Sequence, residues 1–176
     1  MYLELEACVV RPWRETDIDS LAKHANNRKI WLNLRDAFPH PYTRGDAVTY
    51  IGLAISSKPE TRFAITVNKE AVGSIGFLPQ NDVERVSAEI GYWLSEEYWG
   101  RGIMTEVLRA VTEYAMREHD LMRIYALPFE WNTASSRVLE KCGYTLEGRL
   151  RKSAIKNGKV IDQLMWGYVK DDEASG

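Results

Sequence analysis

Hydrophobic and polar residues recur along the chain with two different periods. Three successive segments place an apolar residue at every second position, which is the period of a half-buried β-strand: residues 62–68, 72–78 and 85–94. Residues 103–118 instead repeat apolar positions every three or four residues, with charged residues on the opposite face, as in an amphipathic helix. The middle of the chain therefore predicts a meander of three antiparallel strands followed by a long helix.

Elements of both kinds are predicted on either side of this region. Before it we expect a strand that Pro12 stops, followed by three helices: residues 8–13, 17–26, 28–34 and 43–56. After it we expect a strand, a short helix and a hairpin: residues 122–127, 134–142, 144–152 and 159–169. The pair Lys69-Glu70 is predicted to form the first turn of the meander. Asn157-Gly158 suits a type I′ turn at the tip of the hairpin.

This order of elements predicts a mixed α/β (α+β) fold. Strands 85–94 and 122–127 flank a crossover helix, so they should run parallel, whereas the other neighbouring strands should be antiparallel. We expect a mostly antiparallel sheet with helices on both faces. A chain of 176 residues suits one domain, residues 1–176, with its core at about 8–168 and a frayed tail at 171–176.

Composition and charge exclude several classes of protein. Lys and Arg number 23 and Asp and Glu number 25, and this balance disfavours a nucleic-acid binder. Without an uncharged apolar run of about 18 residues, we expect no membrane span. The two cysteines, Cys8 and Cys142, are too few for a disulfide framework and predict free thiols in the cytoplasm. The three histidines lack metal-ligand spacing, so no metal is expected.

The segment from Trp99 to Thr105 carries the first chemical signal, because two glycines lie between a strand and a helix. Gly100 and Gly102 allow a sharp turn and a close approach of ligand to backbone. The amides of a first helical turn lack intrahelical acceptors and lie at the positive end of the helix dipole. Together these features favour a phosphate or pyrophosphate site. A turn that binds nothing is equally compatible with this segment alone.

Two further signals should lie at the same edge of the sheet. Gly91 interrupts a strand, which often marks a bulge or a close backbone approach, although a packing glycine is the plainer explanation. Asn132 and Ser135 open the helix after the next parallel strand, where they could also be an ordinary N-cap and a first-turn residue. Ligands of mixed α/β sheets tend to bind at this edge.

Three motifs in order resemble the GNAT superfamily of acetyl-CoA-dependent N-acetyltransferases, and most closely its branch of ribosomal-protein N-terminal alanine acetyltransferases. They are Glu89-Ile-Gly-Tyr-Trp-Leu, Glu97-Tyr-Trp-Gly-Arg-Gly-Ile-Met-Thr-Glu106 and Asn132-x-x-Ser-x-x-Val-Leu-Glu-Lys-x-Gly-Tyr144. The resemblance covers roughly residues 8–168. Trp99 and Met104 depart from the phosphate-loop pattern of the family, in which most contacts are made by the backbone.

The resemblance implies how acetyl-CoA would be held. The fourth and fifth predicted strands, 85–94 and 122–127, would splay apart, and the pantetheine arm would enter the gap. The arm would pair with the backbone of one strand and bond to the next helix: Tyr92, Trp93, Leu94 and Asn132. The pyrophosphate would lie on the glycine loop and the helix start, with Arg137 approaching a phosphate: Trp99, Gly100, Arg101, Gly102, Ile103, Met104 and Thr105.

The resemblance also implies direct attack of an amine on the thioester. Glu89 is the candidate base, acting directly or through a water, and an outward-facing strand acid is the alternative. Ser135 would protonate the departing thiolate, and the amides of Tyr92 and Leu94 would stabilise the oxyanion. Cys142 is interpreted as a core residue.

The acceptor is predicted to be a primary amine, either on a small molecule or at a protein N-terminus. Trp31 and Tyr42 could line its pocket, and Asp36 could attract the cationic amine. A non-catalytic CoA-binding or sensory module on the same fold is the alternative function, and an interaction domain without cofactor is a second one. The sequence leaves assembly as a homodimer open.

Overall fold

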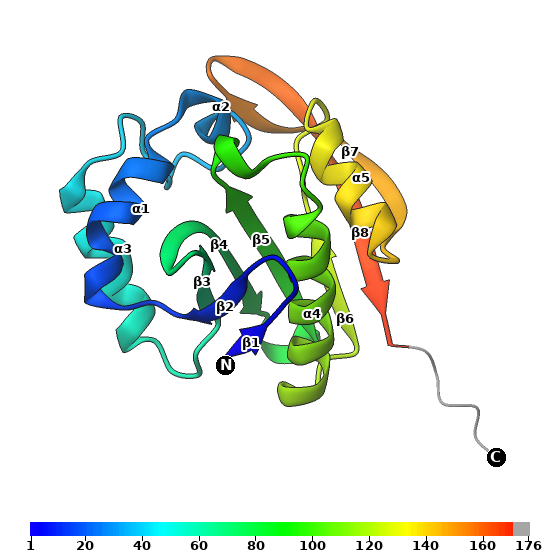
Figure 1. The fold of residues 1–176 in the computed structure, drawn as a ribbon. Helices are drawn as coiled ribbons and strands as arrows, with labels where there is room; N and C mark the ends of the chain where they lie inside the picture. Colours follow the sequence, from blue (N-terminus) through cyan, green and yellow to red (C-terminus); the bar gives the residue numbers. More distant parts are fainter. Residues whose placement is uncertain (171–176) are drawn as a thin grey trace.

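A mixed sheet forms the centre of the protein, and helices cover both of its faces (Figure 1). The computed structural model describes residues 1–170, and within them the sheet has eight strands in the order β1-β2-β3-β4-β5-β6-β8-β7. Their bounds are Leu3–Glu4, Val9–Pro12, Arg62–Val67, Glu70–Pro79, Ser87–Leu94, Arg123–Ala126, Thr145–Lys156 and Lys159–Val169 for β1 to β8. Only β5 and β6 pair in parallel among these described strands, which confirms the predicted fold class.

The helices divide between the two faces of the sheet. Their bounds are Ile18–Ala25, Arg28–Trp31, Arg44–Ser56, Ile103–Glu118 and Thr133–Lys141 for α1 to α5. One face packs against α4, whose buried stripe includes Val107, Leu108 and Val111. The other face packs against α1 and α3, through residues such as Leu21 and Ile51. No helix between residues 1 and 170 has the length and hydrophobicity that a bilayer crossing requires.

Four details differ from the sequence prediction. The strand β1 was not predicted, because two residues are too few to show a period, and it forms where Leu3 pairs with Val10. The first turn of the meander is Asn68-Lys69, not Lys69-Glu70, since both turn residues adopt positive φ, of 50° and 71°. β5 begins at Ser87 because residues 82–84 form a 3₁₀ turn, and β7 continues to Lys156. The expected frayed tail, 171–176, lies outside the described residues.

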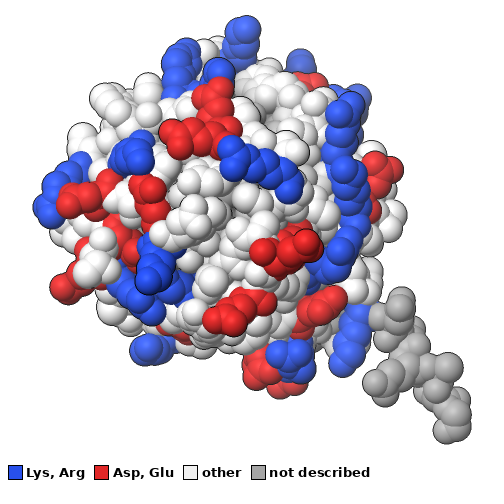
Figure 2. All heavy atoms as spheres, viewed as in Figure 1, with Lys and Arg blue, Asp and Glu red and all other residues white. Residues whose placement is uncertain are grey.

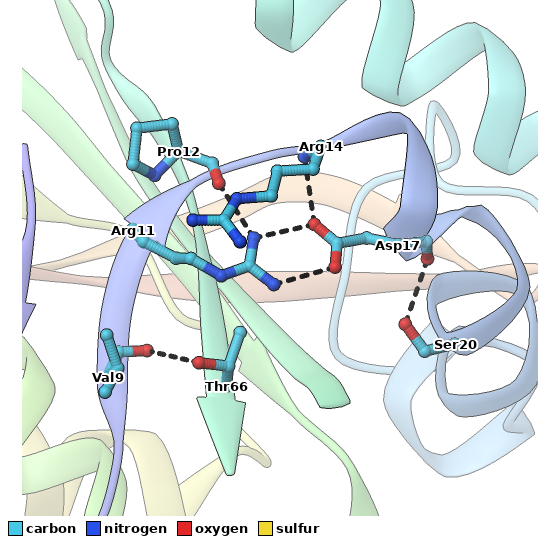
Figure 3. Close-up of polar contacts among 7 residues, drawn as sticks. All are labelled: Val9, Arg11, Pro12, Arg14, Asp17, Ser20 and Thr66. Atoms are coloured by element: carbon cyan, nitrogen blue, oxygen red, sulfur yellow. Dashed lines mark hydrogen bonds and ion pairs between the residues drawn. The ribbon is translucent and has the colours of Figure 1, made fainter. Parts of the chain in front are cut away.

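A buried ion pair fixes the start of α1 against β2 (Figure 3). Both terminal nitrogens of Arg11 donate to the carboxylate of Asp17, each at a distance of 2.8 Å. Asp17 also accepts from the backbone N–H of Arg14 at 2.9 Å. The two side chains are only 7% and 5% exposed. The bidentate geometry and the extra bond satisfy both charges, so the chain leaves β2 in one direction.

The tip of the β7–β8 hairpin reaches back beside α2 (Figure 1). Its Lys156 side chain is 1% exposed, although it carries an ammonium group. The Nζ atom lies 2.8 Å from Oδ1 of Asp36 and 3.8 Å from the ring centroid of Trp31. Carboxylate and indole face together compensate the buried cation. This contact joins the hairpin to the segment after α2, across 120 residues of sequence.

The clasp of Lys156, Asp36 and Trp31 should respond asymmetrically to the loss of each charge. Asp36→Asn leaves the buried ammonium without its anion, so we expect the free energy of unfolding to fall by about 2 kcal/mol. Lys156→Met leaves an exposed carboxylate that water solvates, so we expect a loss below about 1 kcal/mol. Urea unfolding of the two variants and of the double variant measures both values. A larger loss for Lys156→Met than for Asp36→Asn would contradict this description of the clasp.

Candidate active site

The two parallel strands separate partway along their length. β5 and β6 pair from Ser87 with Arg123 as far as Glu89 with Tyr125. Beyond that point β5 continues to Leu94 beside β4, whereas β6 ends at Ala126 and remains paired with β8. A gap therefore opens between β5 and β6, as the family resemblance implied.

The backbone of β5 faces this gap at alternate residues. Ser95 N–H donates to the Val72 carbonyl and Ser87 C=O accepts from the N–H of Gln80, so odd-numbered residues of β5 bond to β4. Successive residues of a strand direct their backbone groups to opposite edges. The N–H groups of Tyr92 and Leu94 consequently point toward the side that β6 has left.

A cavity of about 770 Å³ occupies the gap and passes from one face of the sheet to the other. Ile90 and Tyr92 line it on the face that α4 and α5 cover, while Glu89, Gly91 and Trp93 line it on the α3 face. Gly91 lies in register with Gly76 of β4, and a Cβ added at Gly91 would meet nothing within 4 Å. Gly91 thus leaves open space above β5.

The glycine loop makes the sharp turn into α4 that the sequence allowed. Gly100 and Gly102 have φ angles of 73° and 77°, in the left-handed region that favours glycine. Gly102 is the N-cap of α4 and supplies no side-chain cap. The N–H of Glu106 makes the first bond, to the Gly102 carbonyl, so the amides of the three preceding residues have no intrahelical acceptor: Ile103, Met104 and Thr105.

Two side chains of this loop are occupied by local contacts. The indole N–H of Trp99 donates to the Leu94 carbonyl at a distance of 2.7 Å, so this side chain holds the loop against the C-terminal end of β5. The guanidinium of Arg101 lies 5.1 Å from the ring centroid of Tyr98. The loop does not line the cavity. The cavity and the loop are connected by α5, because the start of this helix lines the cavity and the thiol of its C-cap residue, Cys142, donates to the Thr105 carbonyl at 3.2 Å.

Glu89 lies at the point where the strands separate, and its carboxylate is bound by Arg35. The Glu89 side chain is 21% exposed and lines the cavity, so it is not simply an outward-facing acid. Tyr125 lies beside it on β6, and burial together with the negative charges of Glu89 and Glu84 raises the pKa of its phenol. Arg35 is not among the residues that the sequence predicted, since no local pattern links the segment after α2 to β5.

Ser135 and Asn132 lie at the cavity wall, at the start of α5. The Asn132 side chain accepts from the Ser135 N–H at 3.2 Å, so it forms the N-cap that the sequence allowed. The Ser135 hydroxyl lies 2.8 Å from the Tyr92 hydroxyl. Burial raises the pKa of Tyr92, so its phenol is protonated at neutral pH. The sequence had suggested only a backbone role for Tyr92. Arg137 is exposed on the same helix and does not line the cavity.

The expected acceptor residues separate into two groups. Tyr42 lines the cavity, whereas Trp31 and Asp36 lie in the clasp around Lys156 and do not line it. Cys142 is buried, and burial raises the pKa of its thiol, which is consistent with a core residue. Among residues 1–170, no group of three or more His, Cys, Asp and Glu side chains is placed to hold a metal ion.

Comparison with known proteins identifies relatives over most of the chain. A family model described as "Acetyltransferase (GNAT) domain" matches residues 8–145. An uncharacterized N-acetyltransferase, p20, of Bacillus licheniformis is 34% identical over 176 residues, covering 98% of each chain. A shorter match to the uncharacterized N-acetyltransferase YoaA of Bacillus subtilis is 39% identical and covers 60% of this chain and 59% of that one. The ribosomal-protein-serine acetyltransferase of Escherichia coli is 30% identical over 63% of this chain and 62% of its own length.

Solved structures share the fold at lower identity. An α-N-protein acetyltransferase of ribosomal protein L7/L12, solved in complex with coenzyme A, has a TM-score of 0.86 and 22% identity, covering 97% of this chain and 99% of that one. A GNAT-family acetyltransferase from Bacillus anthracis has a TM-score of 0.83 and 21% identity, covering 98% and 100%. At these identities the likeness shows the fold alone. The assignment to a family rests on the family model and on the Bacillus licheniformis relative. The chain belongs to the GNAT family of N-acetyltransferases.

Proposed function

We propose that this protein transfers the acetyl group of acetyl-CoA to a primary amine, by direct attack of the amine on the thioester. The observation that carries the proposal is the cavity that crosses the sheet where β5 and β6 separate. Its α5 side offers backbone donors and hydroxyl groups to a thioester, and its α3 side offers a carboxylate to an amine. A cosubstrate and an acceptor could therefore meet from opposite faces.

Acetyl-CoA would lie along the α4–α5 side. The pantetheine arm would bond to the backbone of Tyr92 and Leu94, and the pyrophosphate would lie on the amides from Gly100 to Thr105. The fit is supported by the uncapped first turn of α4 and by backbone groups of β5 that face no neighbouring strand. Figure 2 shows a column of Lys and Arg side chains on the side of the molecule where α5 lies, which suits an anionic cosubstrate, and Arg137 is exposed on that helix.

In this reaction the acceptor nitrogen loses two protons and the departing thiolate gains one. Glu89, directly or through a water, would take a proton from the ammonium form of the acceptor, and Arg35 would orient its carboxylate. The amine nitrogen then bonds to the thioester carbon, while the N–H groups of Tyr92 and Leu94 stabilise the oxyanion. When the C–S bond breaks, Ser135 would give its proton to the thiolate and regain one from the Tyr92 phenol, which solvent reprotonates. The nitrogen would pass its second proton to Glu89, which has by then released the first one to water.

The direct test is release of free CoA thiol from acetyl-CoA with a panel of amines that includes peptide N-termini, polyamines and small amines, with product masses measured. The Escherichia coli relative is named for ribosomal-protein serine, so peptides beginning with serine belong in the panel. Acetylation of at least one amine supports the proposal. Tight binding of acetyl-CoA without turnover of any amine would instead support a non-catalytic CoA-binding module.

Gly102→Val tests the phosphate loop. Acetyl-CoA at 100 times its Kd should raise the free energy of unfolding by about 2.7 kcal/mol. Valine at position 102 would strain a φ of 77° and fill the space beside the amides, so we expect most of this increment to disappear. Gly158→Val is the matched control, because its φ of 74° imposes similar strain at the hairpin tip. Equal loss of the increment in both variants, or in neither, would contradict the assignment.

Glu89→Gln tests the base. Without the carboxylate we expect kcat to fall by about 10²-fold, because general-base catalysis is lost, while calorimetry shows nearly unchanged affinity for acetyl-CoA. Glu147→Gln is the control, since Glu147 also binds an arginine, Arg123, but lies outside the cavity. If Glu89→Gln and Glu147→Gln turn over the acceptor equally fast, the base lies elsewhere.

A further inference from the structure

The α3 face of the sheet carries a trough that neither the cosubstrate nor the proposed base occupies. Arg62 of β3, Gly76 of β4 and Gly91 of β5 lie in register across three neighbouring strands. All three line the cavity. The space above Gly91 is open, whereas the space above Gly76 is taken by the Thr61 carbonyl and by the Arg62 side chain itself, which therefore leans over β4 toward β5. The trough therefore leads from the edge where the strands separate to one arginine.

Arg62 is a partly buried cation with spare donors. Its Nη1 atom donates to the Ser57 hydroxyl at 2.9 Å, and the guanidinium forms no ion pair within residues 1–170. A guanidinium has five N–H donors, so most of its hydrogen-bonding capacity is left for another partner. Two hydroxyl groups also line the trough, but they are already bonded: the Tyr50 and Ser74 oxygens lie 3.0 Å apart, and the Ser74 hydroxyl donates to the Phe63 carbonyl at 3.4 Å.

The carboxylates of the cavity are placed away from Arg62. Glu89 is already bound by Arg35. Asp46 lies in the first turn of α3, where it accepts from the Thr43 N–H and hydroxyl, whereas Ser57 follows the last residue of that helix. Asp46 and Ser57 are eleven residues apart along the helix, which corresponds to about 16 Å at roughly 1.5 Å per residue. The Arg62 end of the trough is therefore positively charged.

We propose that Arg62 forms a subsite for a carboxylate carried by the acceptor. This inference rests on the proposed function, since it places the acceptor amine at Glu89. Glu89 lies two strands across and two residues along from Arg62. At a strand spacing of roughly 4.8 Å and a rise of roughly 3.4 Å per residue, the Cα atoms of Arg62 and Glu89 are about 12 Å apart. The acceptor class is thus an amine with a carboxylate at the far end of a chain that spans the trough.

The walls of the trough indicate what connects the two groups. Leu53 of α3 and Leu78 of β4 line the cavity and are 58% and 56% exposed, and Phe38 lines it as well. Apolar groups between a carboxylate site at one end and the base at the other suit a largely uncharged linker. A polyamine, with a second cation near Arg62, is disfavoured by like-charge repulsion.

The test compares 8-aminooctanoate with 8-aminooctanamide, which share the amine and the chain and differ in the distal charge. Binding is measured by calorimetry on protein saturated with CoA, so it needs no turnover. We expect the carboxylate to bind about tenfold more tightly, as charge-assisted hydrogen bonds allow. In Arg62→Met this preference should fall to about one, and Arg62→Lys should keep part of it. The exposed Arg117→Met is the control and should keep the full preference.

Each outcome decides one of the two proposals. Equal binding of the two compounds by the unmodified protein, or a preference that persists in Arg62→Met, would overturn the carboxylate subsite. Thiol release with the same compounds tests the chemistry separately. A preference that depends on Arg62, without acetylation of any amine, would overturn the proposed function and leave the subsite in place. Circular dichroism verifies that each variant is folded before binding is measured.

Discussion

A β-strand inside a sheet has two edges, and each needs hydrogen-bond partners. β5 has β4 along its whole length on one edge, but β6 leaves the other edge after Glu89 because β8 holds β6. The N–H groups of Tyr92 and Leu94 therefore face a gap instead of a strand. Unpaired backbone groups next to a cavity favour a ligand that can bond to them, and the other features of the site are arranged around this gap.

Packing on both faces keeps the gap at a defined place. On one face α4 begins directly after the Gly100–Gly102 turn and buries its apolar stripe against the sheet, so its uncapped amides lie at the same edge as the gap. On the other face the segment after α2 is held by the Lys156 clasp and by the contact between Arg35 and Glu89. The segment after α2 and strand β5, which are far apart in sequence, thus meet at the Glu89 carboxylate.

The parts of this arrangement that follow from local rules could be predicted from the sequence. The alternation of apolar residues predicted the meander, and the two glycines before an amphipathic helix predicted a sharp turn, at which both glycines adopt positive φ in the structure. An N-cap role for Asn132 was the alternative to cofactor binding in the sequence, and the structure has this cap. The Arg35 contact, the Lys156 clasp and the bond between the Ser135 and Tyr92 hydroxyls could not be predicted, because each joins residues from separate elements whose contact depends on tertiary packing.

Amide hydrogen exchange along β5, measured by NMR with and without acetyl-CoA, tests the central claim most directly. The N–H groups of Gly91 and Trp93 point to β4, so their exchange should be slow in both states. The N–H groups of Tyr92 and Leu94 point into the gap, so their exchange should be fast in the free protein and at least about tenfold slower with acetyl-CoA bound. Slow exchange of Tyr92 and Leu94 in the free protein, or rates that acetyl-CoA leaves unchanged, would contradict the account.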